Sequence, residues 1–252
     1  MTAPRLGLLA TMASLSVASW ANAQAVHNWN APAPGNQNFA NPFAWTPIGS
    51  PGPGEEARFN SANSVYTVTF TTDPTNFRTI VGNDHVTFNL NGHTYTLTST
   101  GTSAAIPSLT VGGVTFADDA LLTLTNGRLV GQHAVIASAI FQTAAGMVVD
   151  TGATLNLAGT FTIGKQKPGS LMIQNGGDVL SATGVLGESG AGVGNVTVTG
   201  AGSTWSNSGN IDVGVGTLSI TNQGLVDVGG TLKVLPGGSV ALNGGTLETS
   251  IL

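Results

Sequence analysis

The sequence predicts an all-β fold, a single-stranded parallel β-helix (β-solenoid) that we expect to be right-handed, on three observations. Short segments alternate apolar and polar residues with a period of two, which is typical of β-strands. A unit that begins with glycine repeats every 22 to 25 residues toward the C-terminus. Helical patterns are nearly absent, because even the alanine-rich stretch at residues 134–145 contains β-branched residues and has no capping box.

Residues 1–23 have the features of a secretory signal peptide. Arg5 precedes a short apolar run, and Ala21 and Ala23 are small residues at the two positions that a signal peptidase reads. The run is shorter than the roughly 20 residues that span a bilayer, and no later segment is long enough. We therefore expect cleavage after Ala23, an exported protein and no helical membrane span.

Residues 24–63 differ in composition from the rest of the chain. They contain six prolines among asparagines and glycines, which predicts irregular structure because proline cannot donate to a strand ladder. Trp29, Trp45 and three phenylalanines lie between the prolines, and a disordered linker would have little use for them. We expect this segment to be an irregular N-terminal cap that packs against the following domain.

Alternation begins at about residue 64. Residues 65–70, 86–90 and 94–98 alternate threonine or asparagine with apolar residues, so each predicts a strand. Asn91-Gly92 lies between the last two and is a hairpin-type turn signal. Weaker units of the later repeat follow at residues 119–127 and 146–164.

The repeat is clearest after residue 169, where each unit consists of a glycine, a short alternating run, an Asn/Gly turn and a second short run. A unit this short cannot bury its own apolar side, whereas stacked units align their inward residues in one column. We expect the solenoid to span residues 64–252. The residues predicted to point inward are Leu171, Ile173, Val196, Val198, Leu218 and Ile220, and those predicted to point outward are Met172, Thr197 and Ser219.

The expected dimensions follow from the repeat length. Residues from about 80 to 252 would form about seven to eight coils in a rod of roughly 35 to 40 Å, at ~4.8 Å per strand. The last coil would leave a strand edge unpaired, which predicts end-to-end self-association.

Residues 195–226 resemble the repeat that autotransporter passengers share with exosortase-sorted (PEP-CTERM) surface proteins. They include Val-Thr-Val-Thr-Gly-Ala-Gly-Ser-Thr-Trp at residues 196–205 and Gly-Thr-Leu-Ser-Ile-Thr-Asn-Gln-Gly at residues 216–224. The likeness weakens on either side, over about residues 165–250. It implies a secreted β-helical stalk displayed at the envelope of a bacterium, extracellular or on the cell surface, with no catalytic residues to carry over. The residues up to Leu252 include neither the C-terminal membrane barrel of an autotransporter nor a sorting signal. The resemblance therefore implies either a truncated C-terminal coil or a protein released by other means.

Composition excludes several classes of function. The seven basic residues are too scattered to form a nucleic-acid surface, and only 8% of residues are charged. The absence of cysteine excludes disulfides, a thiol nucleophile and Cys-based metal sites. Gly159 to Lys165 approaches a phosphate-binding loop, but Gln166 replaces the Ser or Thr that would hold Mg²⁺. We expect no cofactor.

A β-helical carbohydrate-active enzyme is the alternative to a stalk. Glycoside hydrolysis needs two carboxylates on one face, about 6.5 to 9.5 Å apart for inversion. Stacked coils could bring Asp150 over Asp178, or Asp212 over Asp227, although the pattern favours solvated turn and outer-face carboxylates for all four. Adjacent Asp118 and Asp119 would face opposite sides of a strand.

The remaining candidates are histidines and one tryptophan. His85 and His93 could meet across the predicted hairpin, but two ligands without a third make a poor metal site, and His27 and His133 have no partner in the pattern. Trp205 could stack on a sugar ring or pack at a corner of the coil, and it is the one candidate binding residue. We interpret the chain as a non-catalytic surface stalk or adhesin-like module whose partners are host or environmental glycans or another surface protein.

Overall fold

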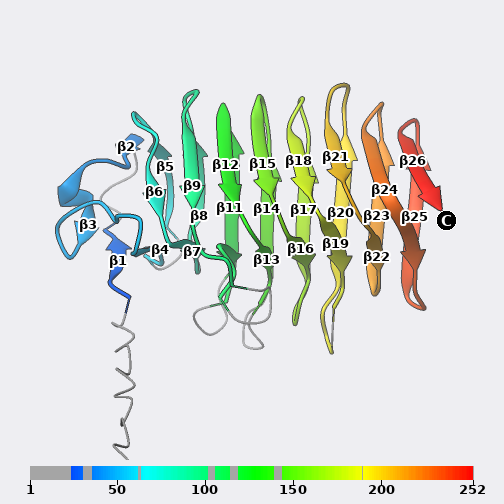
Figure 1. Ribbon diagram of the computed structural model, residues 1–252, viewed down its shortest axis with the longest axis horizontal. Helices are drawn as coiled ribbons and strands as arrows, with labels where there is room; N and C mark the ends of the chain where they lie inside the picture. Colours follow the sequence, from blue (N-terminus) through cyan, green and yellow to red (C-terminus); the bar gives the residue numbers. More distant parts are fainter. Residues whose placement is uncertain are drawn as a thin grey trace, which may run out of the picture.

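The computed structural model describes residues 24–30, 36–61, 64–101, 106–113, 119–138, 144–188 and 190–251. These residues form a parallel β-solenoid of about seven turns, with coils stacked along the long axis of the molecule (Figure 1). Each complete coil contributes one strand to each of three sheets. The only helix among them is a 3₁₀ turn, η1 (Pro42–Ala44). The predicted fold class is confirmed, its handedness remains a prediction, and the expected signal peptide lies outside the described residues.

The first sheet has nine strands, in the order of the chain. They are β2 (Asn36–Asn38), β5 (Val65–Thr69), β8 (His85–Asn89), β11 (Ala120–Thr125), β14 (Ala145–Val149), β17 (Gly169–Ile173), β20 (Gly194–Thr199), β23 (Gly216–Thr221) and β25 (Gly238–Asn243).

The second sheet follows the first across a sharp corner of every coil. Its strands are β6 (Thr75–Asn76), β9 (Thr94–Leu97), β12 (Gly127–Gly131), β15 (Ala153–Leu157), β18 (Asp178–Ser181), β21 (Thr204–Asn207), β24 (Leu225–Val234) and β26 (Thr246–Ile251).

The third sheet completes each coil. Its strands are β1 (Val26–Trp29), β3 (Trp45–Thr46), β4 (Glu56–Phe59), β7 (Arg78–Val81), β10 (Leu109–Val111), β13 (Ala134–Ile136), β16 (Thr160–Ile163), β19 (Thr183–Leu186), β22 (Ile211–Val213) and the end of β24. Because β24 pairs with both β21 and β22, it joins the second and third sheets. Every pair between named strands is parallel except β1 with β3.

Alternation decides which side chains fill the core. The six residues that the sequence predicts to point inward, from Leu171 to Ile220, are at most 1% exposed. Met172 is 39% exposed, and Thr197 and Ser219 are partly exposed on the outer face. The inward and outward predictions are therefore confirmed, because a side-chain period of two leaves only one register that buries the apolar set.

The repeat begins with a glycine for a steric reason. Gly169, Gly194, Gly216 and Gly238 lie in direct register at the start of β17, β20, β23 and β25. A Cβ on Gly216 would overlap the carbonyl oxygen of Gly194 in the coil before it, and the backbone there has φ +139°. The coils can therefore approach closely at this corner only where the residue lacks a side chain.

Asparagines, rather than hairpins, form the corner between the first and second sheets. Asn91, Asn126, Asn175 and Asn222 all have φ between 47° and 54°, a left-handed conformation that asparagine tolerates. The predicted hairpin at Asn91-Gly92 is wrong, because β8 pairs with β5 and β11 while β9 pairs with β6 and β12. Asn91-Gly92 does form a turn, but the two strands that it joins belong to different sheets.

The N-terminal segment, described at residues 24–30 and 36–61, is more regular than its prolines indicate. It contributes β1, β2, η1, β3 and β4, and β4 pairs with β7 in continuous register from Glu56–Arg78 to Phe59–Val81. Strand pairing therefore starts before residue 64, since a neighbouring coil supplies hydrogen-bond partners that the local sequence does not reveal. Four of its aromatic residues are buried at the end of the core, as expected for a cap. They are Trp29, Phe39, Trp45 and Phe59.

At the other end, the last described coil is open. Leu242 and Ile251 are 54% and 60% exposed, whereas Ile220, which lies in register with Leu242 one coil earlier, is fully buried. End-to-end association through this coil remains a prediction.

Candidate functional site

A groove crosses four successive coils on the outer side of the second sheet, and we call it the lateral groove. Its volume is about 400 Å³. Its outward side chains Asn156, Leu180, Ser206 and Asp227 come from β15, β18, β21 and β24 and lie in direct register. The other lining residues are Leu157, Ala158, Ser181, Ala182, Asn207, Ser208 and Gly229.

Small residues at one corner of the coil make room for this groove. Ala158, Ala182 and Ser208 directly follow β15, β18 and β21, and Gly229 occupies the matching place within β24. Because none of them carries a long side chain, the surface is recessed between the second and third sheets. The groove is therefore a product of four aligned corners.

A network of buried polar groups forms the floor of the lateral groove. Ser181 Oγ donates to Asn207 Oδ1 at 2.9 Å, and Asn207 Nδ2 donates to the carbonyl oxygen of Asn210 at 2.8 Å. Trp205 Nε1 donates to Ser181 Oγ at 3.0 Å from below. Since each of these groups is bonded within the protein, the floor is held in one conformation.

Trp205 itself faces the core and is fully buried. A buried indole cannot stack on a ligand, so the predicted binding role is wrong and the structural alternative holds, although Trp205 packs within β21 and not at a corner. The residue belongs to an inward ladder with Val179 and Val226, where alternation buries every member.

Neither carboxylate pair predicted from the sequence is brought together. Asp150 follows β14 and lies beside Gln174, whereas Asp178 begins β18 in register with Thr154 and Thr204. Asp212 is in the third sheet and Asp227 in the second. The expectation of stacking failed because the two members of each pair occupy different positions within the coil. Asp118 lies outside the described residues.

The structure aligns a different pair, Asp227 of β24 and Glu248 of β26, on one outer face. Both are exposed. The signal was present in the repeat, since Val226-Asp227 and Leu247-Glu248 occupy the same position in successive units. Overlaying the second strand of each unit, rather than the first alone, would have found this pair.

Asp150 ties two coils together at the corner between the first and second sheets. Its carboxylate accepts hydrogen bonds from Gln174 Nε2 and Asn175 Nδ2 of the next coil, each at 2.9 Å, and from the amide and hydroxyl of Thr151. Partial burial acts to raise the pKa of Asp150, but these four hydrogen bonds outweigh it and lower the pKa to about 2.

The lowered pKa predicts how Asp150 contributes to stability across pH. Because the folded-state pKa lies below the usual value of about 3.9, the contribution is complete above about pH 5 and is lost as pH falls toward 2. We expect Asp150→Asn to reduce the free energy of unfolding by about 0.5–1 kcal/mol at pH 7, after allowance for solvent screening. Urea denaturation should show this difference shrinking between pH 4 and pH 2.

The control for that measurement is Asp227→Asn, which also removes one negative charge. Among the described residues, none donates a side-chain hydrogen bond to Asp227. If the difference in the free energy of unfolding between wild type and Asp150→Asn stayed constant down to pH 2, the ionised Asp150 carboxylate would not be the stabilising group.

The histidines do not form a metal site. His93 Nδ1 lies 3.1 Å from Asp73 Oδ1, and His85 stands apart from it on the first sheet, in register with Val65 and Leu121. Partial burial lowers the pKa of His133, and its Nδ1 accepts a hydrogen bond from the Thr160 amide at 2.9 Å. Within the described ranges, no group of three or more His, Cys, Asp or Glu residues could hold a metal ion.

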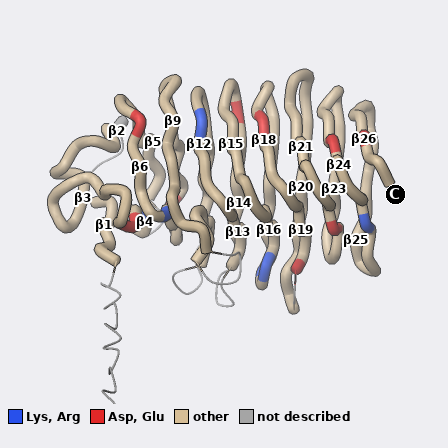
Figure 2. Tube along the Cα trace, viewed as in Figure 1, with Lys and Arg blue, Asp and Glu red and all other residues tan. Residues whose placement is uncertain are grey.

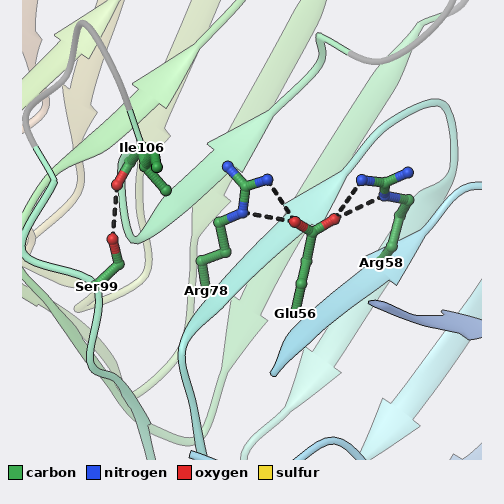
Figure 3. A network of polar contacts seen from close by, with 5 residues as sticks. All are labelled: Glu56, Arg58, Arg78, Ser99 and Ile106. Atoms are coloured by element: carbon green, nitrogen blue, oxygen red, sulfur yellow. Dashed lines mark hydrogen bonds and ion pairs between the residues drawn. The ribbon is translucent and has the colours of Figure 1, made fainter. Parts of the chain in front are cut away.

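Charged residues are spread thinly along the stack (Figure 2), and the closest grouping ties the cap to the next coil. Buried Glu56 of β4 accepts hydrogen bonds from Arg58 Nε at 2.8 Å and from Arg78 Nε of β7 at 2.6 Å (Figure 3). Both guanidinium groups point at the same carboxylate, so the cluster is a structural clamp between two coils.

Comparisons with known proteins identify no relative of this chain. No protein-family model, curated protein or solved structure matches the chain. None of the helical structure in the described part of the chain is long and apolar enough to cross a membrane.

Proposed function

We propose that the chain is an exported, non-catalytic β-solenoid that acts as a stalk or adhesin-like binding module at a bacterial cell surface. The observation that carries the proposal is the continuous register of the first sheet, in which each strand from β5 to β25 pairs in parallel with the strand before it. Stacking equivalent coils adds length without changing the cross-section, which is what a spacer requires.

The outer face also suits this role. It offers threonine, serine and asparagine side chains with few charges, so it stays hydrated without a strong field that would attract counter-charged partners. The residues before Gln24 supply the export route in this proposal.

The test removes one coil. Deleting residues 194–215 joins Val193 to Gly216, which already lies in register with Gly194, so β17 can pair with β23. We expect this variant to fold, to be exported with its mature chain beginning at Gln24, and to bind antibody on intact cells. The rod should shorten by ~4.8 Å.

The matched control removes part of the same coil. Deleting residues 194–203 takes away β20 but leaves β21, which would then enter the first sheet out of register. We expect it to misfold. If both deletions failed equally, or if mature protein kept residues 1–23 and stayed inside the cell, the stalk proposal would be wrong.

A hydrolase is the second candidate, and the aligned pair Asp227 and Glu248 is the observation that favours it. Neighbouring strands are ~4.8 Å apart, close to the separation of about 5–5.5 Å between the two carboxyl groups of retaining glycosidases. This candidate predicts glycan hydrolysis that disappears in Asp227→Asn and Glu248→Gln. The stalk proposal predicts no hydrolysis by the wild type.

A further inference from the structure

We propose that the lateral groove binds an extended, uncharged polysaccharide that lies parallel to the solenoid axis. The site is separate from the spacer role, which depends on the stacking of coils and not on any side chain in the groove.

The spacing of the groove residues indicates a polymer. Asn156, Leu180, Ser206 and Asp227 follow one another across four coils at one strand spacing each, about 4.8 Å. A pyranose unit in an extended chain is about as long as this step. A polysaccharide along the axis would therefore meet a new side chain at each sugar.

The chemistry of these side chains suits sugar rings. Leu180 is 40% exposed at the centre of the groove and offers an apolar surface to the C–H face of a pyranose. Asn156 can donate and accept, Ser206 can do both, and the Asp227 carboxylate accepts from two hydroxyls. None of these three side chains has a hydrogen-bond partner among the described residues, so their polar atoms are free to bind a ligand.

Charge restricts the polymer to uncharged chains. Asp227 is the single charged residue of the lining, so the groove carries one negative charge and no positive one. Uronate, sulfate or phosphate groups would be repelled, whereas neutral hydroxyls satisfy the carboxylate. An extended peptide fits poorly, because β18 and β21 are already paired on both sides and have no free backbone edge to extend.

Affinity gel electrophoresis of the mature chain tests the site. The probes are three neutral polymers, hydroxyethyl cellulose, glucomannan and xylan, and one anionic polymer, polygalacturonate. We expect at least one neutral polymer to retard the wild type and polygalacturonate to have no effect. Leu180→Ala should weaken the retardation about tenfold in apparent Kd, since it removes most of the apolar contact.

Two further variants make the test specific. Met172→Ala is the matched control, because Met172 is 39% exposed but lies on the first sheet outside the groove, and it should bind like the wild type. Asp227→Lys should gain binding to polygalacturonate, a change that a merely structural role would not produce.

The proposal fails if no neutral polymer retards the wild type, if Leu180→Ala and Met172→Ala behave alike, or if Asp227→Lys gains nothing. These results are independent of the coil-deletion experiment, so groove binding and the spacer role can fail separately.

Discussion

Replacing Trp205 with alanine is expected to reduce the free energy of opening the surrounding coils by about 3–5 kcal/mol. The indole is fully buried, and its N–H is the group that holds Ser181 beneath the lateral groove. In a repeat structure the loss is felt first by the nearest coils. Hydrogen exchange should therefore accelerate in β18, β21 and β24 and stay unchanged in β5 and β8.

The same site gives a sharper test, because Gly184 makes room for the indole ring. A Cβ on Gly184 would lie 2.7 Å from Trp205 Cζ2 and 3.2 Å from Ile211 Cγ1, and the residue lies on the inward side of β19. We expect Gly184→Ala to cost about 1–3 kcal/mol through overpacking. In the Trp205→Ala background the added methyl should cost much less, so the two effects are not additive.

Gly54→Ala is the control for this cycle, since a Cβ there meets nothing within 4 Å. Additive effects of Gly184→Ala and Trp205→Ala would show that the methyl and the ring do not compete for one space, contrary to the packing described above.

Replacing Trp45 with alanine is the second change expected to have a large effect, again about 3–5 kcal/mol. Its ring lies 4.8 Å from Trp29, 5.1 Å from Phe39 and 5.5 Å from Phe59, measured between centroids, and its Nε1 donates to the Phe39 carbonyl at 2.9 Å. Without this residue the cap loosens and the end of the core meets water. Urea denaturation measures the loss, and light scattering should reveal association as strand edges become exposed.

Trp45→Phe separates aromatic packing from the hydrogen bond. It keeps much of the buried ring surface, so we expect a smaller loss and no association. A Trp45→Ala protein that remained monomeric with unchanged stability would mean that the cap does not protect the core.

Much of the fold could be predicted because alternation and repetition report directly on burial. The inward positions of Leu171, Val196 and Leu218 follow from a period of two and from the need of each unit for a neighbour. The short strands β1 and β4 could not be predicted in the same way. Their hydrogen bonds are made with other segments, and their proline-rich surroundings favour irregular structure.

The candidate site was harder to predict because it depends on which residues align between coils. The mismatch of Asp150 with Asp178 arises from one aspartate following a first-sheet strand and the other beginning a second-sheet strand. Tryptophan is a residue type that often binds sugars. Trp205, however, occupies one of the alternating positions along β21 that point into the core. The lateral groove has no local motif, since it arises from one small residue in each of four coils.

The central claim is that equivalent strands stack at a constant step, and distances between spin labels test it most directly. The chain contains no cysteine, so cysteine pairs can be placed at outward positions of the first sheet. Thr87 and Thr197 are four register steps apart, Thr87 and Ala241 six, and Thr67 and Ala241 seven. Electron–electron double resonance should give backbone separations of about 19, 29 and 34 Å, rising in proportion to the number of steps. Distances that failed to increase from the first pair to the third would contradict the stack.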